Sequence, residues 1–134
     1  MENKIIIDAA NTILGRLASY AAKQALFGKS IIIVNCNLAI LSGSKSMVIN
    51  QYKEERAKGS TSLKGPHFPK DPERLVKRTI RGMLSYKQER GRSAFKRIMC
   101  YNDVPAEYAD SQKIALAKTL KFKTITLKEL SQRI

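Results

Sequence analysis

Hydrophobic positions in the first third of the chain follow two different periods. Lys4–Asp8 ("KIIID") and Ser30–Asn35 ("SIIIVN") have continuous β-branched centres, which is the pattern of strands buried on both faces. Between them an apolar stripe repeats at three- and four-residue steps and predicts a helix that Asn11 or Thr12 caps and Gly28 ends; the stripe is Leu14, Leu17, Ala18, Ala21 and Ala25. Strand, helix and strand in this order form the crossover unit of a parallel sheet, so the opening half of the chain is α/β.

Shorter elements fill the rest of the chain. We predict a third short strand within Asn37–Gly43, a helix from about Ser46 to Ala57, and another strand at Arg97–Tyr101. Nearer the C-terminus, Ile114–Leu120 is compatible with a helix or a turn, and the letters "FKTI" that follow it predict a short extended piece. A Thr-x-x-Glu capping box at Thr126 opens a last helix that runs to Ile134.

A helix predicted from Asp71 to Leu84 separates apolar from charged residues most sharply. Asp71 caps it, and its first turn holds Pro72 and Glu73, residue types that a helix N-terminus prefers. At about 100° per residue, one side is apolar and consists of Leu75, Val76, Thr79, Ile80 and Met83. The opposite side carries four cations: Arg74, Lys77, Arg78 and Arg81. Such a row of like charges costs stability unless an anion is bound, and the alternative interpretation is an ordinary solvated face.

Two segments flank this helix as basic extensions. Gly59–Lys70 ("GSTSLKGPHFPK") is either a flexible linker or an ordered arm in which Phe68 serves as an apolar anchor or a stacking platform. After the helix loosens at Gly82, Tyr86–Arg97 ("YKQERGRSAFKR") is expected to continue the charge as a second arm. Its two aromatic residues can stack on an unpaired base or fill the core, and Phe95 is expected in the core.

Length and charge narrow the class of protein. A chain of 134 residues can bury about two-thirds of its unfolded surface, so we expect residues 1–134 to form one domain that needs neither a disulfide nor a metal to fold. Hydrophobic residues make up 43% of the chain, which excludes a disordered tail, and the formal net charge is +14. Residues 56–97 hold 13 basic and 3 acidic side chains and carry +10 of that charge. These numbers predict a polyanionic partner for this segment.

The cysteines and the longest apolar run indicate a soluble cytoplasmic protein. Cys36 and Cys100 are the only cysteines and could form a disulfide, but two buried free thiols in a reducing compartment are the simpler interpretation. Without a CxxC spacing, and with His67 as the only histidine, a zinc site is not expected. The run Ile31–Val34 is far shorter than the roughly 20 residues of a membrane span, and Asp8 interrupts the N-terminal apolar run that a signal peptide would need.

Catalytic motifs are weak. Phe27–Ser30 ("FGKS") suggests a phosphate-binding loop, but Lys23 stands where that motif requires glycine. The turn "SGSKS" can present backbone N–H groups to a phosphate, which suits RNA contact as well as nucleotide binding. No acid/base or nucleophilic site can be named, which argues against an enzyme. A DNA-binding or chromatin protein would share the charge, but the sequence has no helix-turn-helix or zinc-finger pattern.

Several short motifs between Ile6 and about Pro105 together point to one family. They are "GRLAS" at Gly15–Ser19, "VN" at Val34 and Asn35, "SG" at Ser42 and Gly43, "RGML" at Arg81–Leu84, and "RG" at Arg90 and Gly91. In this combination the chain closely resembles the large-subunit ribosomal protein L13 family, in the branch shared by archaea and eukaryotes. Ser85 departs from the family pattern, which usually has proline after "RGML", and this bears on the stiffness of the turn.

The resemblance implies a three-layer α/β/α domain with a mostly parallel four-stranded sheet and basic loop or arm extensions. It also implies a structural, non-catalytic part of the large subunit that binds large-subunit rRNA, contacts neighbouring ribosomal proteins, supports subunit assembly and translation, and uses no cofactor or metal. A regulator that binds messenger RNA outside the ribosome is the alternative. The RNA-contacting residues carried over are Arg16, Gly43, Lys45, Lys64, His67, Lys70, Arg74, Lys77, Arg78, Arg81, Lys87, Arg90, Arg92, Lys96 and Arg97.

Overall fold

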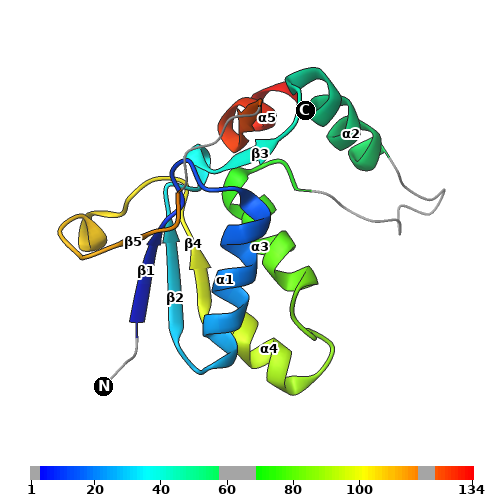
Figure 1. The fold of residues 1–134 in the computed structure, drawn as a ribbon. Coiled ribbons are helices and arrows are strands. Elements are labelled where there is room, and N and C mark those ends of the chain that lie inside the picture. Colours follow the sequence, from blue (N-terminus) through cyan, green and yellow to red (C-terminus); the bar gives the residue numbers. More distant parts are fainter. Residues whose placement is uncertain (1–3, 58–68, 118–122) are drawn as a thin grey trace.

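A four-stranded parallel sheet forms the centre of the molecule (Figure 1). The computed structural model describes residues 4–57, 69–117 and 123–134. The strands of the sheet are β1 (Lys4–Asp8), β2 (Ser30–Val34), β4 (Ile98–Cys100) and β5 (Ile114–Ala115), in the order β4-β2-β1-β5. Every neighbouring pair is parallel. The predicted α/β class is therefore confirmed.

Three helices cover one face of this sheet (Figure 1). They are α1 (Leu14–Leu26), α3 (Pro72–Gly82) and α4 (Glu89–Lys96). The main core lies between the helices and the sheet, and the following side chains are almost completely buried there: Ile7, Leu17, Ile31, Ile33, Val76, Ile80 and Ile98. Each such side chain contributes roughly 1.5–3 kcal/mol through burial, which is more than a surface ion pair contributes. Core packing therefore decides where the helices sit.

The opposite face of the sheet carries a second, smaller core. Ile6, Ile32 and Val34 are buried beneath the partly buried side chains of Tyr101, Val104 and Tyr108. The cover on this face includes a short 3-10 helix, η2 (Ala106–Tyr108), rather than a long α-helix. The Tyr101 and Tyr108 ring centroids lie 6.2 Å apart, and Lys4 Nζ lies 5.7 Å from the Tyr108 ring centroid. Aromatic side chains therefore cover this face of the sheet and form the third layer of the molecule.

A two-stranded antiparallel sheet stands beside the main one. It pairs β3 (Ile40–Ser42) with β6 (Thr124–Thr126). α2 (Lys45–Ala57) and α5 (Leu127–Arg133) accompany it, and η1 (Cys36–Leu38) links β2 to β3. The predicted third strand therefore exists, but it belongs to this second sheet.

Several element boundaries confirm the predictions. Gly28 has φ +90° just beyond α1, where the helix was expected to end, and its N–H donates to the Ala25 carbonyl. The predicted capping residue of the last helix is also confirmed, because Thr126 Oγ1 accepts a hydrogen bond of 3.2 Å from the Glu129 N–H. The predicted helix near Ser46 begins one residue earlier, at Lys45.

The predicted cap of α1 is wrong. The N-cap position belongs to Ile13, and no side chain caps this end of the helix. Asn11 adopts a left-handed conformation with φ +58°, and the Thr12 hydroxyl donates to the Ala10 carbonyl at 3.3 Å. Both side chains therefore belong to the turn before the helix, and the Ile40 N–H bonds the Thr12 carbonyl to fix that turn against β3.

The predicted burial of the apolar side of α3 is confirmed except near the end of the helix. Leu75, Val76 and Ile80 are buried as predicted, but Met83 is 46% exposed. The helix ends at Gly82, so the chain beyond it no longer rotates by a helical step, and Leu84 turns into the core instead.

Two predictions of local structure are wrong. Tyr86–Arg97 was expected to be a second basic arm, but residues 89–96 of this stretch form α4. Gly91 and Ala94 are buried and hold this helix against the rest of the molecule. Ile114–Leu120 was expected to be a helix or a turn, whereas its first two residues form β5, and Lys118–Leu120 lie outside the described residues.

The cap of α3 comes from a distant residue. Asp71 occupies the predicted N-cap position, but its side chain makes no capping hydrogen bond. Instead, Asn102 Oδ1 accepts from the Glu73 N–H at 2.9 Å. An amide oxygen in the loop after β4 therefore satisfies a free N–H group of the first helical turn and ties α3 to that loop.

We expect Gly91→Ala to lower the free energy of unfolding by about 1–3 kcal/mol in urea denaturation. The reason is steric, because a Cβ atom at Gly91 would overlap the backbone carbonyl of Ser85. Gly15→Ala is the matched control, since a Cβ atom there meets nothing within 4 Å on an exposed part of α1. The control should raise stability by about 0.5–1 kcal/mol. Equal effects of the two substitutions would contradict the packing described for α4.

Asn102→Ala should lower stability by about 1–2 kcal/mol, because the Glu73 N–H loses its acceptor. Asp71→Ala should cost about 0.5 kcal/mol or less, since its carboxylate makes only a long, exposed ion pair. Urea denaturation of both variants compares the two residues directly. A larger loss for Asp71→Ala would mean that the sequence-predicted cap was correct.

Candidate nucleic-acid interface

α3 presents its cations on the side away from the core. Because Leu75, Val76 and Ile80 fix the helix on α1 and β4, the opposite side is held in one orientation. Arg74 and Arg81 are exposed there, and the Arg74 side chain retains 73% of its accessible surface. Lys77 and Arg78 are half-buried.

Aromatic rings support two of these cations. Lys77 Nζ lies 5.3 Å from the centroid of the Phe95 ring, which α4 contributes. The Arg81 guanidinium carbon lies 4.4 Å from the Tyr86 ring centroid. A ring face attracts a cation without neutralising its charge, so both heads are oriented and can still bind an anion. Phe95 is half-buried and also packs against the main core, as expected.

The other two cations of α3 have different surroundings. Arg74 Nε lies 3.9 Å from Asp71 Oδ2, and both side chains are largely exposed, so this pair holds Arg74 weakly. Arg78 borders a groove of about 210 Å³ between α2 and α3, together with Tyr52 and Thr79. Burial raises the pKa of Tyr52, with a further contribution from Glu55, so this phenol stays neutral in the physiological range.

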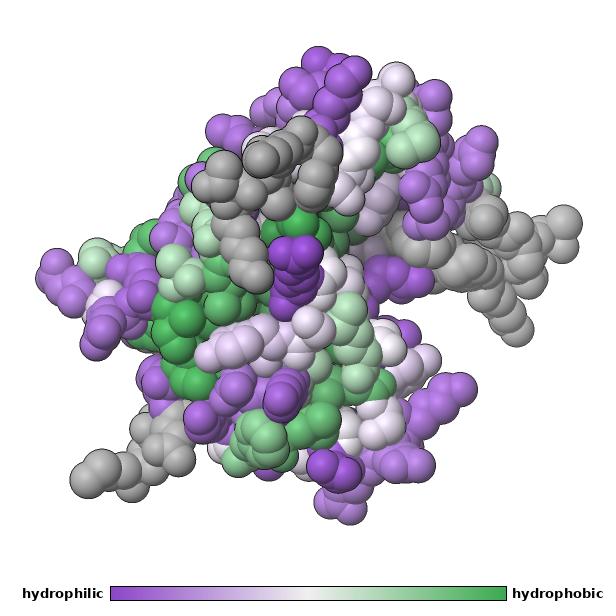
Figure 2. Space-filling view, in the orientation of Figure 1, coloured by the Kyte–Doolittle hydropathy of each residue, from purple (hydrophilic) through white to green (hydrophobic). Residues whose placement is uncertain are grey.

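The turn after α3 and the surface of α4 extend the positive region. Four exposed cations lie on this stretch: Lys87, Arg90, Arg92 and Lys96. Arg92 Nη2 donates to the Lys87 carbonyl at 3.3 Å, which braces the turn. Figure 2 shows hydrophilic side chains projecting at the lower right, where α4 lies in Figure 1. In the described residues, α3 and α4 therefore form the densest cationic surface, which we call the α3–α4 surface.

Besides Arg74 and Arg92, two further predicted RNA-contacting cations make polar contacts within the protein, and these reach residues far away in the chain. Arg97 Nη1 donates to the Ala25 carbonyl at 2.9 Å and thereby adds a second hydrogen bond to this group at the C-terminal end of α1. Lys45 Nζ lies 3.1 Å from Glu129 Oε1, which Arg133 also approaches at 3.3 Å. These two contacts join distant parts of the chain, so both cations have a structural use.

The remaining predicted residues are spread over other parts of the chain. Arg16 is exposed on α1, and Lys70 is exposed just before α3. Gly43 has φ +123° in the turn that leads into α2, a backbone conformation that favours glycine. Lys64 and His67 lie outside the described residues.

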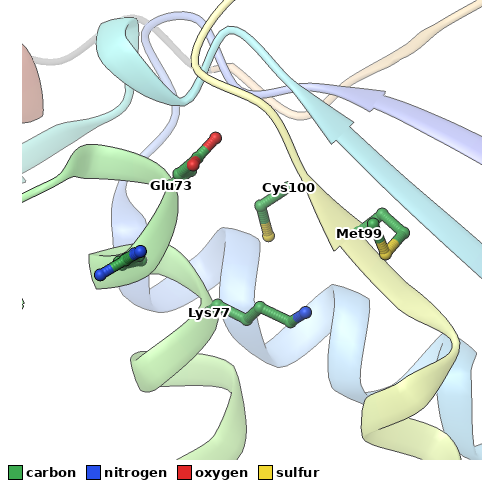
Figure 3. Close-up of a pocket in the computed structure, with 5 residues that line it drawn as sticks. Glu73, Lys77, Met99 and Cys100 are labelled. Carbon is green, nitrogen blue, oxygen red and sulfur yellow. The ribbon is translucent and has the colours of Figure 1, made fainter.

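A cavity of about 270 Å³ opens between α3 and β4 (Figure 3). Its lining residues are Glu73, Arg74, Lys77, Met99 and Cys100. Figure 3 shows Lys77 reaching from α3 toward β4, with the Cys100 thiol pointing into the same space. Pattern analysis of the sequence missed this cavity, because its two walls are distant in the chain and Met99 and Cys100 belong to an unremarkable short strand.

The two thiols near this cavity are free, as expected from the sequence. Cys36 is buried, and Cys100 is only half-buried. A hydrogen bond with the Cys100 thiol and burial both raise the pKa of Cys36 far above its ordinary value, so Cys36 stays protonated. Within the described ranges, no group of three or more His, Cys, Asp or Glu side chains could hold a metal ion. In the same ranges, no helix has the length and the apolar composition needed to cross a bilayer.

The fold and the α3–α4 surface define a basic α/β protein, and a concentrated positive surface of this kind is typical of proteins that bind polyanions. Comparison with known proteins identifies the family. The family model described as "Ribosomal protein L13" matches residues 2–107. This chain belongs to the ribosomal protein L13 family, and the resemblance read from its motifs is confirmed.

Archaeal relatives support the same assignment over almost the whole chain. The chain is 47% identical over 135 residues to "Large ribosomal subunit protein uL13" of Methanosarcina barkeri, with 96% of each chain covered. It is 44% identical to the protein of that name from Archaeoglobus fulgidus, with 95% of this chain and 85% of the relative covered. The protein of that name from Methanocaldococcus jannaschii is 43% identical, with 96% of each chain covered.

Proposed function

We propose that this protein is a structural, non-catalytic constituent of the large ribosomal subunit. It binds large-subunit rRNA, contacts neighbouring ribosomal proteins, supports subunit assembly and translation, and acts in the cytoplasm with the ribosome. The observation that carries the proposal is membership of the L13 family, with relatives named as large-subunit proteins over 95–96% of this chain.

The α3–α4 surface is the main RNA contact in this proposal. Its cations bind phosphate oxygens, which set affinity and register without reading base sequence. Arginine suits this role because its planar fork of donors matches the geometry of phosphate oxygens. The rigid attachment of α3 supports the proposal, because a row of charges fixed in advance loses little conformational freedom on binding. Specificity then comes from the folded shape of the RNA, its 2′-hydroxyls and its unpaired bases.

The full set of proposed RNA contacts extends beyond this surface. Arg16, Gly43, Lys45 and Lys70 add contacts from other elements, and Lys64 and His67 belong to the basic segment 56–97 of the single proposed domain, residues 1–134. Arg97 is the weakest member of the set, because its guanidinium already bonds the Ala25 carbonyl.

We expect replacement of Arg74, Lys77, Arg78 and Arg81 by glutamine to flatten the salt dependence of rRNA binding. If each cation neutralises one phosphate, the slope of log affinity against log salt should decrease in magnitude by about three. Titration of an rRNA fragment at several salt concentrations measures the slope, and far-ultraviolet circular dichroism should stay unchanged, because these side chains lie outside the core.

A matched control removes the same charge from exposed positions outside this segment: Lys23, Lys53, Lys123 and Lys128. The control should change the slope less than the α3 variant does. An unchanged slope in the α3 variant would refute the role proposed for its cationic side.

A tagged copy of the protein should sediment with the large ribosomal subunit after a moderate-salt wash of a cell extract. A structural constituent held by many phosphate and shape contacts dissociates slowly under these conditions. Recovery only in light messenger ribonucleoprotein fractions would overturn the proposal and favour a regulator outside the ribosome. The α3 variant described above tests in the same gradient whether incorporation depends on that surface.

A further inference from the structure

We propose that the cavity between α3 and β4 binds one unpaired guanine nucleotide of the RNA. The inference rests on the proposed RNA-binding function and assigns one base to one pocket within it. It concerns the residues in Figure 3, of which Glu73, Met99 and Cys100 were not among the predicted RNA contacts.

The size and walls of the cavity suit a single base. Its volume of about 270 Å³ lies just below the range of about 300–1,000 Å³ that is usual for pockets binding drug-sized molecules. The hydrogen bond from the Glu73 N–H to Asn102 Oδ1 and the packing of α3 on β4 fix both walls. β4 is also the outermost strand of its sheet, so its free edge offers backbone donors and acceptors beside the cavity.

The charges around the cavity are mixed, and this excludes a simple phosphate site. Arg74 and Lys77 can bind the phosphates of a nucleotide at the rim, but a phosphate inside the cavity would also meet the Glu73 carboxylate. No ion pair involves Glu73 within the described part of the chain, although both cations lie on the same helix. Its oxygens are therefore free to accept hydrogen bonds from a ligand that carries donors.

Guanine is the base whose donors match a carboxylate. Its N1–H and 2-amino groups are adjacent and point the same way, so one carboxylate can accept from both. Adenine and cytosine offer one amino group on the corresponding edge, and uracil offers one N–H. A two-point contact of this kind to a base edge discriminates by about tenfold or more. The Cys100 thiol, which points into the cavity, supplies a polarisable surface against which a ring can pack.

The rim of the cavity is ordered before a ligand arrives. The Phe95 ring holds the head of Lys77 at 5.3 Å, and core burial of the α3 stripe holds its backbone. A nucleotide therefore meets a carboxylate and an ammonium group that α3 already presents about one helical turn apart.

The test uses short single-stranded RNAs and the full-length protein. Fluorescence anisotropy compares seven-nucleotide oligoadenylates whose central residue is guanosine, inosine or adenosine. Inosine keeps N1–H but lacks the 2-amino group, so it removes one of the two donors. We expect the guanosine RNA to bind about tenfold more tightly than the adenosine RNA, with inosine between them. Chemical-shift changes at the backbone amides of Met99 and Cys100 should accompany binding of the guanosine RNA.

Glu73→Gln is the decisive variant, and Glu89→Gln is its control. Both remove one negative charge from the first turn of a helix, but only Glu73 lines the cavity. Any general gain in RNA affinity from the lost charge should therefore appear in both variants. The preference for guanosine should fall to nearly onefold in Glu73→Gln and persist in Glu89→Gln.

Equal binding of the three RNAs by the wild-type protein would overturn this inference, as would a guanosine preference that survives Glu73→Gln. Either result leaves the proposed function intact provided that the rRNA fragment still binds with a steep salt dependence. Loss of rRNA binding by the wild-type protein would instead refute the proposed function itself.

Discussion

Burial of the apolar side of α3 is the interaction on which the rest of the candidate site depends. Leu75, Val76 and Ile80 are at most 4% exposed. Each contributes roughly 1.5–3 kcal/mol through burial, whereas each unfavourable pair of like charges on the other side of the helix costs roughly 0.2–0.5 kcal/mol. The packing term is several times larger, so the helix can carry an unbalanced row of cations without losing its position.

Aromatic residues connect this helix to the next one and organise its charge. Phe95 belongs to the core side of α4 and lies beside Lys77, while Tyr86 in the intervening turn lies beside Arg81. The buried Gly91 lets α4 approach the backbone of Ser85 closely. A basic stretch that would repel itself as an extended chain is thereby folded into a surface with a defined shape.

The carboxylate of Glu73 gives this surface a feature that charge alone does not supply. A purely cationic surface binds any polyanion, whereas an acceptor set among cations favours ligands that combine phosphates with hydrogen-bond donors. Membership of the L13 family and the proposed guanine site are therefore compatible, since one concerns the particle that the protein joins and the other concerns a single contact within it.

Local periodicity in the sequence was sufficient to predict β1, α1 and β2, the two sides of α3 and the Thr126 cap, because neighbouring residues decide each of them. Three features depended on residues far apart in the chain: the Asn102 cap of α3, the helix α4 with its buried glycine, and the cavity beside Cys100. A hydrophobic pattern reports which side of an element is buried, but not which distant group covers it or satisfies its free N–H. Only packing in three dimensions brings those partners together, and so only the tertiary structure decided them.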